Sequence, residues 1–543
     1  MSDEPAPAPD AKAEDAPPEK PGDDVRRSAP PSQPPRAAGD SVLRKIARNV
    51  LSSWIYIVAS AVSSIFLTPY LIHRLGDTGY GIITTIAGLV GYSGILYLGM
   101  GGAVVRYSAE YLAKNDKVSL REMLSTIFGV YCGMGLFCFL ACLGLAYPLP
   151  WLLNIPEESV LDARAVLLMT GFALLIQFPG SVFSGFVQGA NRYDVLNGRM
   201  LFVLVVRIAA TIAILEYRPS VIAIGALTAV TAILEALWSV LYVRWRFPDV
   251  RFGPRGFRRA RLKSLLGFSL RSMFLNVSNA LIQSTDEAVI SQARGPAMVT
   301  PYVIPLRLGD YARQLMDKAT ETLVPTVVEA ATHKDTARLQ AVWRFTVKAG
   351  LAIGIPIALV FIVWGHDVIS LWIGDRHAND GSLALAFLAV AFLAQIPGRS
   401  VTYPVMIALN DLSAVVRIVI IEGVLNLALS VVLVRTELGI AGVALGTAIP
   451  AALTGFVMLP YVACRAVGVS FLSHTLETVV RGALPVPITL GAMYGLHALG
   501  LTRSIPTLAL ACLGALVVHL AASAVLCLSA ADRALVLKKI RRR

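Results

Sequence analysis

The chain has 543 residues, of which 56% are hydrophobic and only 15% are charged. Soluble domains carry about a quarter charged residues. Apolar runs of the roughly 20 residues that cross a hydrocarbon core recur along nearly the whole sequence. This composition excludes a soluble globular protein and predicts an all-α, polytopic membrane protein.

Residues 1–40 differ in composition from the rest of the chain. They alternate proline, alanine and charged residues, contain no aromatic residue and lack the apolar stretch of a cleavable signal peptide. Such a segment cannot bury enough apolar surface to offset its ordering entropy. We interpret it as a disordered cytoplasmic tail and keep a docking arm for a partner as the less favoured alternative.

The apolar runs between charged or turn-rich breaks predict about fourteen membrane spans. Their expected limits are 48–72, 79–105, 123–147, 163–187, 197–216, 220–243, 264–290, 297–325, 343–364, 384–407, 413–434, 439–463, 477–499 and 504–528. The run 297–325 has the weakest membrane signal, because its second half is strongly polar.

Lysine and arginine are concentrated in alternate loops and at the C-terminus, whereas most intervening loops hold one such residue. Because cytoplasmic loops carry the excess of positive charge, both termini are predicted to be cytoplasmic, in the plasma membrane of the cell. The most basic loop, 244–263, would suit nucleic acid in a soluble protein. Between two spans it indicates positive-inside topology and contact with anionic membrane lipids, so no nucleic acid is expected.

Two parts of the chain repeat each other at a nearly constant offset. The segment Gln177–Gly180 (QFPG) returns as Gln395–Gly398 (QIPG), a shift of 218 residues. At a shift of 219, Gly76 matches Gly295 and Asn191 matches Asn410. Matched proline and glycine interruptions in a duplicated helical bundle are typical of two-lobed transporters.

The repeat predicts an N-lobe over 41–253 with spans one to six and a C-lobe over 254–470 with spans seven to twelve. Residues 471–543 would add spans thirteen and fourteen and a basic cytoplasmic tail outside the duplication. The lobes should be related by an axis along the membrane normal, with the transported group between them. The expected helix interruptions or hinges are Pro179, Gly180, Pro301, Pro305, Pro397 and Gly398.

Motifs of catalytic or cofactor chemistry are missing from the sequence. It has no Walker A, H-E-x-x-H or G-x-S-x-G pattern, and its six cysteines have no metal-site spacing. The longest outer connections, 148–162 and 365–383, are short for an extracytoplasmic catalytic platform. We therefore expect no cofactor, no metal centre and no enzyme activity.

Charged side chains inside apolar spans are the candidate functional groups, because an ionisable group in hydrocarbon usually faces a wet or protein-lined cavity. The run 297–325 carries a polar stripe at helical spacing, and Arg313 could pair with Asp317 four residues later. If that span instead ends near Leu315, its later charges form a solvated cytoplasmic extension. The cavity candidates are Arg271, Asn279, Gln283, Asp286, Arg307, Asp310, Arg313, Asp317 and Arg399.

Arg106, Arg199, Arg207, Arg417 and Glu422 are further cavity candidates. Arg199 and Arg417 match at a shift of 218 and lie near the inner face, where we expect them to snorkel toward water. Glu235 lies inside the sixth span, and a partner such as Arg207 is expected. Lumenal arginines would suit an anionic load such as phosphate; a mixture with carboxylates could also bind a coupling cation.

Several short motifs resemble the polysaccharide (O-antigen) flippases of the multidrug/oligosaccharidyl-lipid/polysaccharide exporter superfamily. They are the run from Asn49 to Gly76 followed by Tyr80-Gly81, then 98–101 with Arg106-Tyr107, 188–192, and Asp286–Gly295 with Tyr302. A basic cluster on the first span, as in the peptidoglycan-precursor flippases, is absent.

The resemblance implies two six-helix lobes in a MATE-like V around a cationic cavity with alternating access. It also implies transport of a polyprenyl-diphosphate-linked oligosaccharide across the bacterial inner membrane for O-antigen or lipopolysaccharide synthesis, in contact with other glycan-assembly membrane proteins. Arg307, Arg313 and Arg399 would then be the lumenal arginines. A multidrug or cation antiporter of the same superfamily is the second interpretation, and an envelope glycan polymerase or ligase the third.

Overall fold

The computed structural model describes residues 36–96, 100–253, 256–258, 285–321, 324–333, 335–409 and 412–527. Every regular element in these ranges is a helix, and no strand occurs among them. The predicted all-α architecture is therefore confirmed. The chain divides into two compact units, Met1–Val50 and Leu51–Arg543. The expected C-lobe and the expected N-lobe from residue 51 onward fall within the second unit, and the boundary between the lobes at 253 stays a prediction.

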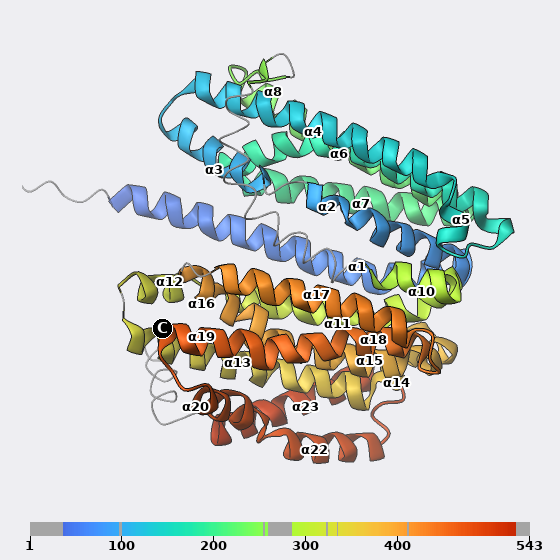
Figure 1. Cartoon of the computed structure of the whole chain (residues 1–543), viewed down its shortest axis with the longest axis vertical. Coiled ribbons are helices and arrows are strands. Elements are labelled where there is room, and N and C mark those ends of the chain that lie inside the picture. Colours follow the sequence, from blue (N-terminus) through green and yellow to red (C-terminus); the bar gives the residue numbers. More distant parts are fainter. Residues whose placement is uncertain are drawn as a thin grey trace, which may run out of the picture. The chain divides into compact units, whose positions relative to one another are not determined.

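The helices of the first half are joined by short turns (Figure 1). They are α1 (Arg36–Gly91), α2 (Ser93–Leu96), α3 (Met100–Ala113), α4 (Lys117–Ala146), α5 (Leu149–Leu152), the 3₁₀ turn η1 (Glu157–Ser159), α6 (Val160–Gly189), α7 (Tyr193–Tyr217) and α8 (Val221–Arg246). Side-chain caps fix two starts: Asp116 accepts from the Ser119 amide (2.9 Å) before α4, and Ser220 accepts from the Ala223 amide before α8.

The second half continues in the same manner. Its elements are α10 (Asp286–Arg294), η3 (Pro296–Met298), α11 (Val299–Glu321), α12 (Val324–Thr332), α13 (Thr336–Val363), α14 (Gly365–Ile373), α15 (Asp375–Gln395), η4 (Ile396–Ser400), α16 (Thr402–Ala408), α17 (Leu412–Leu433), α18 (Gly439–Ala452), η5 (Leu453–Met458) and α19 (Leu459–Val467). After these come α20 (Phe471–Thr475), η6 (Leu476–Val480), α21 (Arg481–Ala483), α22 (Val486–Ala498) and α23 (Ile505–Leu526).

Eleven helical segments in the described ranges are long and apolar enough to cross a membrane. One of them, Ser52–Gly91, has 40 residues, about 60 Å at helical rise and twice the hydrocarbon thickness. It contains most of the first expected span, 48–72, and the first part of the second, 79–105, on the two sides of a break at Gly76. The polar α11 is not among the eleven, and most of the expected span 264–290 lies outside the described residues. The total of fourteen spans stays a prediction.

The duplicated glycines have the same backbone conformation. Gly76 has φ 71° and ψ 170°, and Gly295 has φ 85° and ψ 162°. L-residues rarely adopt these angles, so glycine is needed at both turns. The turns at these two glycines, which are 219 residues apart, therefore share one backbone geometry, as the duplication predicts.

Helix packing repeats as well. In the first half α6 packs between α4 and α8, and in the second half its counterpart at the repeat offset, α15, packs between α13 and α18. A Cβ added to Gly180 would stand 3.1 Å from Ala236 of α8. A Cβ added to Gly398 would stand 2.6 Å from the Cα of Gly455. The matched glycines thus permit close helix crossings at corresponding places.

The proline-containing sites interrupt their helices to different degrees. Pro179 lies inside an unbroken α6, whereas Pro397 and Gly398 belong to a π-helical turn, η4, that ends α15. Pro305 lies inside α11 and has no amide to donate to the carbonyl of Pro301 four residues earlier. The backbone of α15 approaches that carbonyl, since a Cβ on Gly381 would lie 2.7 Å from it. Whether any of these sites acts as a hinge stays a prediction.

Candidate functional site

The charged stripe of α11 is partly neutralised within the helix. Arg313 contacts Asp310 at 3.2 Å and Asp317 at 3.4 Å, so the pair expected from spacing is present and has a second acid. Asp317 also accepts a hydrogen bond from Ser400 of η4 at 2.7 Å. These three charged side chains keep between 28% and 44% of their surface exposed, so they lie outside the buried core.

Arg399 of η4 is paired with a carboxylate of α17. Its guanidinium lies 3.1 Å from Glu422, whose side chain is 3% exposed. Glu422 also accepts a hydrogen bond from Thr454 at 2.8 Å. A buried pair of this kind costs desolvation and is retained when both charges are satisfied. The positive charge of Arg399 is thus compensated by Glu422, which weakens its attraction for an anionic load.

Arg307 is the remaining arginine of the predicted set in the described ranges. It is half-buried on α11, one turn before Asp310. It interacts electrostatically with Tyr80 of α1 and with Glu287 of α10. Arg307 therefore faces both halves of the molecule, whereas Arg313 and Arg399 are held by acids of the second half. The other candidates Arg271, Asn279 and Gln283 lie outside the described residues.

Asp286 occupies a buried cage of oxygen atoms. Its carboxylate accepts hydrogen bonds from Tyr302 (2.5 Å), Thr447 (3.0 Å) and Ser430 (3.4 Å). The Val443 backbone carbonyl also accepts from the hydroxyls of Ser430 and Thr447. Asn426 donates to Thr447 at 2.8 Å, while its own Oδ1 is buried with no hydrogen-bond partner among the described residues.

The cage joins α10, α11, α17 and α18 around one formal negative charge. Among the described residues, no group of three or more His, Cys, Asp or Glu side chains is placed to hold a metal ion. One carboxylate with hydroxyl, amide and carbonyl oxygens suits a weakly held monovalent cation or a proton better than a divalent metal. The sequence analysis singled out Asp286 and also Tyr302, but not Asn426, Ser430 and Thr447, which lie on spans that are otherwise apolar.

Arg199 differs from its expected snorkelling position. Its side chain is 11% exposed and donates to Ser184 (2.7 Å) and Ser239 (2.8 Å) inside the first half. Glu235 lies 3.9 Å from Arg199, so its partner is Arg199 rather than Arg207. The expectation was wrong because hydroxyls on α6 and α8 accept hydrogen bonds from the buried guanidinium. Arg417, in contrast, is exposed and donates to the Ser413 carbonyl.

A set of contacts that sequence reasoning missed joins α1 to the second half. Asp77, next to the Gly76 break, lies 2.8 Å from His377 and 3.2 Å from Arg376 of α15. Its backbone carbonyl accepts from Thr300 at 2.8 Å, and Trp372 donates to the Ile65 carbonyl at 2.7 Å. We call these contacts of Asp77 with Arg376 and His377 the Asp77 clasp. It lies at the end predicted to face outside.

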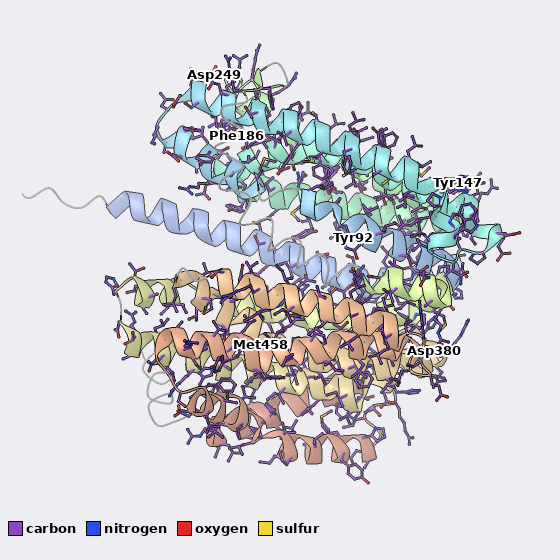
Figure 2. All side chains as sticks on the ribbon, viewed as in Figure 1. Tyr92, Tyr147, Phe186, Asp249, Asp380 and Met458 are labelled. Atoms are coloured by element: carbon purple, nitrogen blue, oxygen red, sulfur yellow. The ribbon has the colours of Figure 1, made fainter. Side chains whose placement is uncertain are left out.

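Replacing Asp77 with alanine is expected to open this end. Arg376 and His377 lose their acceptor, so the closed arrangement should weaken by about 1–2 kcal/mol, roughly fivefold to thirtyfold in equilibrium. The measurement is labelling of a cysteine introduced at the buried Thr300 by a membrane-impermeant maleimide in a variant without the natural cysteines. Asp380→Ala, at an exposed position of the same end (Figure 2), is the matched control. Equal labelling rates for Asp77→Ala and its parent would contradict a clasp.

Comparison with known proteins agrees with this architecture. A family model described as "Polysaccharide biosynthesis protein" matches residues 78–379. The uncharacterized membrane protein EpsK of Bacillus subtilis (strain 168) is 18% identical over 415 residues, covering 75% of this chain and 81% of EpsK.

Two solved structures share the fold. An inward-facing multidrug resistance MATE family transporter of the MOP superfamily is 16% identical with a TM-score of 0.66, covering 78% of this chain and 98% of the transporter. The lipid II flippase MurJ, in an inward closed conformation, is 13% identical with a TM-score of 0.65, covering 88% of this chain and 98% of MurJ. At these identities the likeness establishes the fold, which is that of MOP superfamily transporters. Because the family model spans more than half of the residues, the chain belongs to the polysaccharide biosynthesis protein family.

Proposed function

We propose that the protein flips a polyprenyl-diphosphate-linked oligosaccharide from the cytoplasmic to the outer leaflet by alternating access. The observation that carries this proposal is the family membership combined with the fold of MOP superfamily transporters. A glycan and a diphosphate cannot cross hydrocarbon unaided, because each unsolvated polar or charged group costs several kcal/mol. A hydrated passage beside the bilayer lowers that cost while the polyprenyl chain stays in lipid.

Arg307 supports an anionic load. It lies on the polar helix α11 near Tyr80 of the first half, and among the described residues it is not held by a carboxylate in the way that Arg313 and Arg399 are. A guanidinium can bind two phosphate oxygens at once. We propose that it contacts the diphosphate, with Asp310 and Asp317 shaping the same face.

The Asp286 cage supports coupling to a cation gradient. A cation entering among Asp286, Ser430, Thr447 and Asn426 would gain oxygen ligands, including the unpartnered Asn426 Oδ1. Removal of the cation leaves a buried carboxylate held only by hydroxyls. Such a difference between states is what links an ion gradient to a conformational cycle.

The decisive experiment follows labelled lipid-linked glycan in cells that lack the gene. Loss of surface glycan with accumulation of the precursor on the cytoplasmic side supports the flippase. Unchanged glycan together with increased sensitivity to cationic dyes supports a multidrug or cation antiporter, which the MATE-like fold and the Asp286 cage also suit. Unchanged precursor topology with shortened surface chains would favour a polymerase or ligase instead.

The proposal includes a location and partners. The protein would lie in the bacterial inner membrane with both termini in the cytoplasm, its basic inner loops against anionic lipids. An inner-face ion pair, Lys117 with Asp249 at 2.8 Å, joins the start of α4 to the loop after α8 and lowers the pKa of the Asp249 carboxyl. Neighbouring glycan-assembly proteins would supply the lipid-linked substrate and receive the product.

A further inference from the structure

An apolar groove lies where the first half of the molecule meets α10. Its volume is about 230 Å³, and among the described residues it is lined by aliphatic side chains and by the amide of Gln292. The first half contributes side chains of α1, α4 and α5, and the second half contributes those of α10. The lining includes Leu89, Leu145, Leu149, Ala288 and Val289.

The groove interrupts a contact that is otherwise tight. Ser291 of α10 is fully buried and donates at 2.8 Å to the carbonyl of Leu153, which lines the groove. About two helical turns before Leu89, a Cβ added to Gly81 would lie only 1.9 Å from the Pro296 carbonyl. Packed protein interiors leave few voids larger than a water molecule. A groove of this size at the contact between the halves is therefore a candidate binding site.

Exposed aromatic side chains indicate the depth of the groove in the membrane. Tyr147 (labelled in Figure 2) and Trp151 stand on either side of Leu149 in the sequence and are 71% and 69% exposed. Their rings pack edge to face with centroids 5.3 Å apart. Such residues are enriched where lipid head groups meet the hydrocarbon. Leu152, which lines the groove, is itself 49% exposed, so the groove reaches the protein surface at the level of the head groups.

The size and lining of the groove suit one isoprenoid chain. An apolar cavity of about 150 Å³ holds benzene, so by proportion this groove holds about nine carbons, or nearly two isoprene units. A phospholipid brings two acyl chains, and a saturated chain loses more conformational entropy on binding than one whose double bonds do not rotate. The exposed Gln292 adds an amide donor at the groove, where a diphosphate would follow the first isoprene unit.

We propose that this groove binds the isoprenoid chain of the lipid-linked substrate through the units next to the diphosphate, with Gln292 donating to a phosphate oxygen. The inference rests on the proposed function, which supplies the class of substrate. The walls of the groove come from both halves, so separation of α10 from α5 would open it. At the end predicted to face outside, that opening would release the chain to the outer leaflet. A phospholipid acyl chain is the competing occupant.

The experiment is photolabelling of the purified, unaltered full chain in lipid nanodiscs. The probe is farnesyl diphosphate with a diazirine on its second isoprene unit, and labelled peptides are identified by mass spectrometry. Label is expected on residues 145–153 and 288–292, and unlabelled long-chain polyprenyl diphosphate should displace it. A phospholipid with a diazirine on one acyl chain is the parallel probe. It should label these residues no more than it labels other exposed apolar positions.

Substitutions in the groove sharpen the result. Ala288→Phe fills the groove and should lower the labelling by about tenfold or more, because an isoprene unit loses its apolar contacts there. Ala213→Phe adds the same ring at an exposed position of α7 and should leave the labelling unchanged. Gln292→Leu keeps the size and removes the amide. It should weaken displacement by polyprenyl diphosphate and leave displacement by the uncharged polyprenol as it was.

Label confined to other peptides, equal labelling of the groove by the phospholipid probe, or full labelling of Ala288→Phe would overturn the proposal. Flipping of the lipid-linked glycan is measured separately in proteoliposomes. A chain that binds the probe in the groove but flips no lipid-linked glycan would refute the proposed function and leave the isoprenoid site standing. A chain that flips the glycan while its groove takes no label would refute this inference alone.

Discussion

Arg307→Ala is expected to slow flipping of the lipid-linked glycan by about tenfold to hundredfold. A charged hydrogen bond contributes about 1.5–3 kcal/mol, and each 1.4 kcal/mol is a factor of ten. The loss should fall on substrate binding, because Arg307 is the proposed contact of the diphosphate and is not part of the Arg313 or Arg399 ion pairs. The measurement is the flipping rate of a fluorescent polyprenyl-diphosphate oligosaccharide in proteoliposomes.

Two variants sharpen this result. Arg307→Lys keeps the charge but loses bidentate geometry, so an intermediate rate is expected. Arg417→Ala removes an exposed arginine that contacts only a backbone carbonyl in the described structure, and it should leave the rate unchanged. If Arg307→Ala flips substrate at the rate of the parent, the diphosphate is not held at this side chain.

Asp286→Asn is expected to abolish cation-dependent stabilisation of the purified protein. A cation present at about 100 times its Kd stabilises the state that binds it by about 2.7 kcal/mol. Asparagine can keep the hydrogen bonds to Tyr302 and Thr447, so the fold should survive while the charge is lost. The measurement is the Tm in sodium or lithium chloride against choline chloride at equal ionic strength.

The neighbours of Asp286 provide graded controls. Ser430→Ala and Thr447→Ala each remove one oxygen from the cage and should weaken the response to cation without abolishing it. Asp310→Asn removes a carboxylate of α11 outside the cage and should leave the response intact. A full Tm response in Asp286→Asn would show that the cation binds elsewhere or not at all.

Local patterns predicted more of the structure than did patterns that need tertiary contacts. The spacing of Arg313 and Asp317 predicted their ion pair, because helical residues four apart are neighbours. The offset between Gly76 and Gly295 predicted a repeated turn, because both turns need φ angles that favour glycine. Both inferences depend on backbone geometry within a few residues.

The remaining contacts depend on how helices rotate against one another. Asp77 and His377 are 300 residues apart, and nothing in either local sequence relates them. Asn426 and Ser430 stand four residues apart on an apolar span, and nothing in that spacing relates them to Asp286. Arg199 was misplaced for the same reason: its distance from the membrane surface suggested water, whereas helix rotation turned it toward Ser184 and Ser239.

The break in α1 has a consequence for sequence variation among relatives. Gly76 holds φ 71° and ψ 170°, and its chain neighbour Asp77 forms the contacts with Arg376 and His377. Any other residue at 76 would store strain of about 1–3 kcal/mol and redirect the carboxylate that follows. We therefore expect Gly76 and Asp77 to be kept or replaced together among relatives. Replacement of Asp77 should be accompanied by replacement of His377, three hundred positions downstream.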